Sequence, residues 1–123
     1  MSFDIALVQW VEEALEPVGH VSMRRMMGGA TLYLDGTVFA IVADDLLWFK
    51  ADAASDPVWD EAGCARFTYQ MREGRSGTMN YRRAPDDVYD DADAMRQWAA
   101  LALEAGVRAP AKKARKKRAK PVR

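Results

Sequence analysis

Hydrophobic residues near the start of the chain recur at three- and four-residue spacing, as they do along one side of a helix. Ser2 precedes this run as an N-cap, and Pro17 and Gly19 follow it as helix-ending residues. The apolar positions are Phe3, Leu7, Trp10, Val11, Ala14 and Val18. The pattern predicts an amphipathic first helix.

Extended segments separated by turn residues follow this helix. They are residues 21–27, 30–34, 37–43 and 46–50. Asp35-Gly36 supplies the positive φ angles of a type I′ hairpin turn, and Asp44-Asp45 separates the next pair of segments. Gly28-Gly29 between the first two segments is typical of a bulge or a close backbone approach. The pattern predicts an antiparallel meander of at least three strands.

The second half of the chain begins with a short predicted helix between Asp52 and Gly63. Ser55 is its expected cap, Pro57 lies in its first turn, and Gly63 is an αL stop.

A second hairpin is predicted from alternation on both sides of a loop at residues 73–77. The expected buried face consists of Phe67, Tyr69, Met71, Met79 and Tyr81. The expected wet face consists of Arg66, Thr68, Gln70, Arg72, Thr78, Asn80 and Arg82. The arginines would make that face cationic.

Pro85 ends the hairpin, and an acidic stretch leads into a final helix. The acidic residues are Asp86, Asp87, Asp90, Asp91 and Asp93. The apolar stripe of the helix consists of Met95, Trp98, Ala99, Leu101, Ala102 and Ala105, and Gly106 is expected to close it. Capping of this helix explains the carboxylates better than a calcium loop, which needs a central glycine and a terminal Glu.

The predicted order is helix, three strands, short helix, two strands, helix. Such an order favours a two-layer α+β domain, with an antiparallel sheet and helices packed against one face. Residues 1–107 suit one domain in length.

Charge divides the chain at the same point. Residues 1–107 carry nine Lys and Arg against 18 Asp and Glu, whereas residues 108–123 carry nine and none, so a net charge of zero hides a −9/+9 division. The basic segment has no aromatic residue, and Val122 is its one large aliphatic residue. We therefore expect a disordered tail.

The composition narrows the classes of chemistry. With one Cys and one His, the chain can form neither an internal disulfide nor a Cys/His zinc cluster, and we expect no metal and no cofactor. No stretch reaches the ~18 apolar residues of a membrane span, and the start of the chain lacks a signal-peptide pattern. We expect a cytoplasmic protein without a membrane partner.

Candidate catalytic groups are few. Asp44 and Asp45 are expected to be solvated turn residues, and Cys64 a half-buried structural thiol. His20 lies near Ser22 in the sequence, but a nucleophile also needs a third, orienting group. We predict no catalytic residue, and a small enzyme remains the third hypothesis.

The basic tail is the clearest chemical signal, because clustered cations bind a polyphosphate backbone with release of counterions. The expected nucleic-acid-binding residues are Arg108, Lys112, Lys113, Arg115, Lys116, Lys117, Arg118, Lys120 and Arg123. Two alternatives stay open: the tail is a solubilising end, or it folds back on its own acidic domain.

Residues 25–36, Arg-Met-Met-Gly-Gly-Ala-Thr-Leu-Tyr-Leu-Asp-Gly, resemble the R-x-M-F-G-G-x-G-x-Y-x-D-G signature of the TfoX/Sxy N-terminal domain family. The likeness spans about residues 3–105, and Met27, Thr31 and Trp48 depart from the usual pattern. The motif positions to which we assign a structural role are Met26, Gly28, Gly29, Asp35, Gly36, Phe39, Lys50, Tyr81, Pro85 and Trp98. Further matches are Ala40, Leu46, Asp52, Phe67, Tyr69 and Ala99.

The resemblance implies a fold similar to that of secretion chaperones, with the same order of elements. It also implies a regulator of DNA uptake and competence, although longer family members carry a second domain where this chain has its tail. The leading hypothesis is a non-enzymatic regulator that associates with DNA or RNA through the tail. The alternative is a protein-interaction module or homodimer, in which the tail is incidental.

Overall fold

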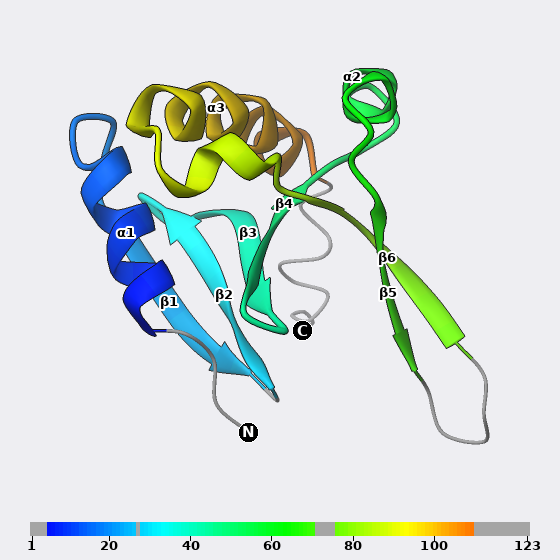
Figure 1. Cartoon of the computed structure of the whole chain (residues 1–123), viewed down its shortest axis with the longest axis horizontal. Coiled ribbons are helices and arrows are strands. Elements are labelled where there is room, and N and C mark those ends of the chain that lie inside the picture. The colour runs from blue at the N-terminus through cyan, green and yellow to red at the C-terminus, as the bar shows by residue number, and fades with distance from the viewer. Residues whose placement is uncertain (1–4, 27, 71–75, 110–123) are drawn as a thin grey trace, which may run out of the picture.

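Figure 1 shows the computed structural model of the chain, which describes residues 5–26, 28–70 and 76–109. The helices are α1 (Ile5–Leu15), α2 (Asp56–Glu61), the 3₁₀ helix η2 (Asp86–Tyr89) and α3 (Ala92–Arg108). The strands are β1 (Val21–Met26), β2 (Gly29–Leu34), β3 (Thr37–Ala43), β4 (Leu46–Lys50), β5 (Arg66–Gln70) and β6 (Ser76–Arg83). The predicted α+β class is confirmed.

All six strands belong to one antiparallel sheet in the order β1-β2-β3-β4-β6-β5. The first four form the meander, whose two-residue turns have positive φ at Asp35, Gly36, Asp44 and Asp45. The second hairpin joins it through a short contact, in which only residues 48–50 of β4 pair with β6. The rest of that hairpin extends beyond β4 (Figure 1).

The core lies between the sheet and the layer of helices. Leu32, Phe39 and Phe49 from the sheet are completely buried, as are Val11 of α1 and Trp59 of α2. The Trp59 ring stacks on Phe49 and packs against Trp98 of α3. Burial of these large side chains is the main contribution that holds the layers together.

Several boundaries differ from the sequence prediction. The extended segment before Gly28 is a full edge strand, β1, so four strands precede α2. Val18 lies outside α1 and is 47% exposed, because the helix ends at Leu15, which is completely buried. The 3₁₀ helix η2 was not predicted.

Gly106 does not close α3, which continues to Arg108. A Cβ at Gly106 would collide with the carbonyl oxygen of Val38 and the methyl group of Thr37. This glycine therefore lets the helix approach β3 closely and does not mark the end of the helix.

The second hairpin differs in facing from the predicted one. Arg82, expected on the wet face, is 2% exposed, whereas Phe67, Met79 and Tyr81 are only partly buried. Arg82 pairs across the sheet with the core residue Phe49, so it faces the helix layer. Arg66 and Thr68 are exposed as predicted, but the strand face that carries Arg82 is turned toward the helix layer, where Asp56 and Asp60 of α2 hold the arginine.

Two further predictions concern helix starts. Ser55 precedes α2 as expected, but its side chain does not cap the helix; it exchanges hydrogen bonds with Asp52. Asp91 does cap α3, because its carboxylate accepts hydrogen bonds from the N–H groups of Asp93 and Ala94. Capping therefore accounts for one member of the acidic cluster directly.

Candidate functional site

The basic segment begins in the last turn of α3. Arg108 forms a bidentate ion pair with Asp52, with Nε–Oδ2 and Nη2–Oδ1 distances of 2.7 and 2.8 Å. The remaining predicted tail residues lie outside the described part of the chain: Lys112, Lys113, Arg115, Lys116, Lys117, Arg118, Lys120 and Arg123. The origin of the segment is thus tied to the loop between β4 and α2.

The ion pair also shifts the titration of Asp52. Hydrogen bonding from the Arg108 guanidinium, opposed by partial burial, lowers the pKa of this carboxyl from 3.8 to about 2. The same pairing raises the pKa of Arg108. Both groups are therefore charged at neutral pH, and Arg108 is partly neutralised by its own domain.

A cavity of about 580 Å³ adjoins this ion pair, a volume within the range of small-ligand sites. It lies between β4, β6 and the end of α3, and its lining includes Lys50, Asn80, Tyr81, Arg108 and Ala109. The Lys50 ammonium lies 5.3 Å from the centre of the Tyr81 ring. Burial and the nearby Tyr33 raise the pKa of Tyr81, so its hydroxyl is uncharged at neutral pH.

Arg82 forms a second charged cluster on the helix side of the sheet. Its guanidinium donates to Asp60 at 2.8 Å, to Asp56 at 3.1 Å and to the carbonyl oxygen of Cys64 at 2.9 Å. Arg66 lies nearby, 3.7 Å from Asp56. Of the three arginines of the predicted cationic face, Arg66 and Arg82 are paired with α2, and Arg72 lies outside the described residues.

The glycines and turn residues of the signature shape the backbone. Gly28 has a φ of +77°, and a Cβ at Gly29 would collide with the carbonyl oxygen of Val42. Gly28-Gly29 therefore permits the close approach expected from the sequence. The Asp35 carboxylate accepts a hydrogen bond from the His20 N–H at 3.1 Å and so ties the hairpin turn to the start of β1.

The other signature residues are spread over the fold. Phe39 is completely buried, Met26 ends β1, and Trp98 packs on Trp59. Pro85 precedes η2 with an extended backbone. Lys50 and Tyr81 lie together at the cavity beside Arg108, and Pro85 lines a separate cavity beside Cys64.

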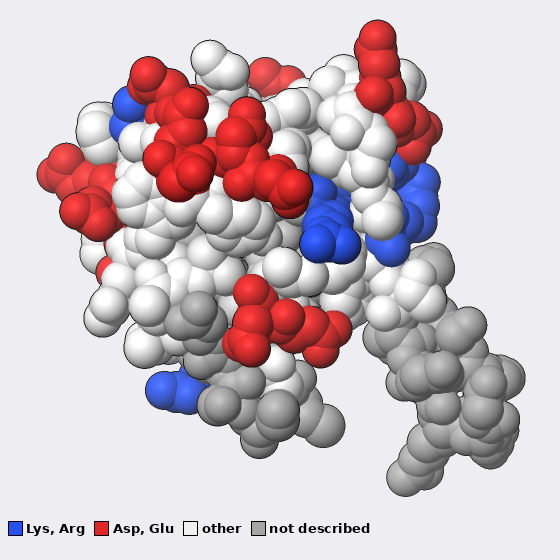
Figure 2. Space-filling model, viewed as in Figure 1, with Lys and Arg blue, Asp and Glu red and all other residues white. Residues whose placement is uncertain are grey.

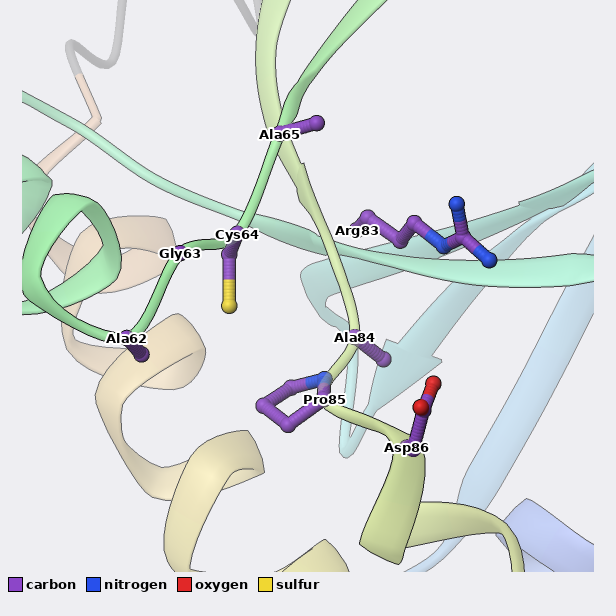
Figure 3. Close-up of a pocket in the computed structure, with 8 residues that line it drawn as sticks. All are labelled: Ala62, Gly63, Cys64, Ala65, Arg83, Ala84, Pro85 and Asp86. Atoms are coloured by element: carbon purple, nitrogen blue, oxygen red, sulfur yellow. The ribbon is translucent and has the colours of Figure 1, made fainter.

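A second cavity, of about 420 Å³, contains the thiol of Cys64 (Figure 3). The sulfur points between the end of α2 and Pro85, while Arg83 points away from it. Burial raises the pKa of the thiol, and the charge of Arg82 opposes this only in part. Cys64 is therefore a protonated thiol at neutral pH.

The residues named for a catalytic hypothesis do not converge. Neither His20 nor Asp44 lines the Cys64 cavity. Asp44 and Asp45 are exposed, as expected of turn residues. Among residues 5–26, 28–70 and 76–109, no three His, Cys, Asp or Glu residues are placed to hold a metal ion, and no helix is long and apolar enough to cross a membrane.

The model of the TfoX N-terminal domain matches residues 13–106, which is most of the described fold. The chain belongs to the TfoX N-terminal domain family. In this member of the family, the matched region ends two residues before Arg108, where the charge of the chain changes sign.

Two curated relatives support this membership. Protein Sxy of Escherichia coli K12 is 33% identical over 85 residues, which cover 63% of this chain and 37% of Sxy. DNA transformation protein TfoX1 of Aliivibrio fischeri ES114 is 28% identical over 67 residues, which cover 54% of this chain and 32% of that protein. The matched region thus spans about a third of each relative.

Proposed function

We propose that this TfoX N-terminal domain protein is a non-enzymatic regulator of the competence type, and that it associates with nucleic acid through residues 108–123. One relative is named protein Sxy and the other DNA transformation protein TfoX1, and neither name describes catalysis. The observation that carries the proposal is the run of nine cations without an acidic residue, which starts where the family domain ends.

The Arg108–Asp52 ion pair gives Arg108 a different role from that of the eight cations that follow it in the sequence. Arg108 is held by the domain, so it fixes the point from which the following eight cations depart. A segment anchored in this way would bring the folded domain close to the phosphate backbone without reading its sequence.

The test compares DNA binding by the full chain and by a truncation after Ala109, which keeps the Arg108–Asp52 pair intact. We expect the truncation to weaken binding and to flatten its salt dependence by about 0.9 in slope for each lost phosphate contact. A full-length control, with Gln in place of the eight cations after Ala109, should behave like the truncation. Equal affinity of all three proteins at low salt would refute the role of the tail.

The second candidate is a protein-interaction module, and the position of β5 at the edge of the sheet favours it. In the described sheet, β5 pairs with β6 alone and its other edge has no strand beside it. Such an edge can add a strand from another chain. Sedimentation of the truncated domain decides this: a dimer that survives truncation supports the module, and a strict monomer without a bound protein counts against it.

A further inference from the structure

Alternate residues of the strands point away from the helix layer and form a second face of the sheet. The cross-strand partners Leu32, Ala40 and Phe49 belong to the core. The neighbouring row runs through Arg24, Thr31, Ile41, Trp48 and Arg83. Because side chains alternate along each strand, this row lies on the face opposite the helices, which we call the open face.

The open face carries a group of aromatic side chains. Trp48 and Phe67 meet edge to face, with ring centroids 4.9 Å apart. Tyr33 and Tyr81 lie on the same face by register, and all four rings are partly exposed. Ile41 in the same row is only 2% exposed. The open face therefore carries four partly exposed rings, two of them in contact, beside the buried Ile41.

The charges of the folded domain are divided between its layers. The six strands contain six Lys and Arg residues and no Asp or Glu, so every described acidic residue lies on a helix, a turn or a loop. Acidic side chains gather over η2 and the start of α3 in Figure 2. Arg82 and Arg66 are paired with α2, whereas Arg24, Lys50 and Arg83 lie on the open face. The domain has a net charge of −9, yet this face is cationic.

The open face is also continuous with the start of the basic segment. Lys50 and Tyr81 end the aromatic surface at the cavity beside Arg108, and Ala109, the last described residue, lines the same cavity. A polyanion on the open face would thus reach the origin of the tail without crossing the acidic helix layer.

We propose that the open face binds single-stranded nucleic acid, with unpaired bases stacked on its aromatic rings and phosphates held by Arg24, Lys50 and Arg83. The inference deepens the proposed function, on which it rests, by naming the strand state of the ligand. A double helix buries the faces of its bases in its own stack, so aromatic side chains on a sheet favour unpaired bases. The cations between the rings match the charge of the backbone.

The test measures the affinity of the full chain and of the truncation after Ala109 for an oligothymidylate of about 15 nucleotides and for a duplex of equal length. Trp48→Leu keeps an apolar side chain in the position across from Ile41 and removes the stacking ring, and Trp48→Phe restores a ring. We expect Trp48→Leu to weaken oligothymidylate binding about 5- to 100-fold in both the full chain and the truncation. Trp48→Phe should recover most of the lost affinity. Thermal unfolding of each variant checks that the fold is kept.

Arg83→Gln on the open face should weaken binding, whereas Arg96→Gln, the same change on the helix layer, should not. Quenching of tryptophan fluorescence by the oligonucleotide should be weaker in Trp48→Phe although its affinity is kept, a signal that a purely structural role would not produce.

The possible failures of the two proposals differ. If the tail truncation abolishes binding while Trp48→Leu and Arg83→Gln leave it unchanged in the full chain, the open-face inference is overturned and the tail function stands. If the open-face variants weaken binding and the truncation does not, the tail function fails. Tighter binding of the duplex, or a dimer that Trp48→Leu converts to a monomer, would overturn the single-strand inference.

Discussion

Arg108 in the last turn of α3 and Asp52 after β4 are 56 residues apart in sequence and form a bidentate ion pair. The pair joins the end of the final helix to the loop that leads into α2. It also connects the last part of the folded domain to the first residue of the basic segment.

Removal of Arg108 should raise the pKa of Asp52 from about 2 toward its ordinary value of 3.8. Because the folded-state pKa is lowered, the pair stabilises the fold fully above pH 4 and loses this contribution as the pH falls toward 2. The stability difference between wild type and Arg108→Gln should shrink over the same interval. NMR titration of the Asp52 carboxyl checks the shift, and Arg96→Gln, which touches Asp93 and Ala14, should leave it unchanged.

Arg82→Ala should destabilise the domain by about 3 kcal/mol, because it removes a buried guanidinium that holds α2 against β6. Its neighbour Arg83 is exposed, so Arg83→Ala should change the free energy of unfolding by less than about 0.5 kcal/mol. Urea unfolding of both variants measures the difference. Similar small effects at the two positions would show that the inward facing of Arg82 is wrong.

Gly106→Ala should destabilise the protein by about 1–3 kcal/mol through its collision with the β3 backbone at Val38. Helix propensity alone predicts the opposite sign, a gain of about 1 kcal/mol. The sign of the change in thermal unfolding therefore tests how closely α3 approaches the sheet. A stabilised variant would contradict the contact.

Asp91→Ala should cost about 1 kcal/mol, because two N–H groups at the start of α3 lose their acceptor. Asp91→Ser keeps an oxygen acceptor and should recover most of the stability. Asp90→Ala, next to the cap, is the matched control and should be nearly neutral. Equal losses at both positions would mean that general charge, and not capping, is what matters in the acidic stretch.

The sequence predicted the domain class and most element positions because their signals are local. Asp35-Gly36 demands positive φ angles, and helical spacing in the final segment leaves one apolar stripe, so the turn and the helix follow from nearby residues. The signature around Gly28-Gly29 likewise placed the chain in its family. The −9/+9 division of charge is a property of the sequence itself.

The tertiary structure decided which face each residue of the second hairpin presents. Alternation separates Arg82 from Tyr81, but only the placement of Asp56 and Asp60 on α2, beside the inner face of the sheet, makes the arginine the inward residue. Pairing of β3 with β4 put Ile41 beside Trp48, and the fold brought Arg108 to Asp52. The candidate open face depends on these long-range contacts, because its residues come from all six strands of the described sheet and no local pattern records which strands become neighbours.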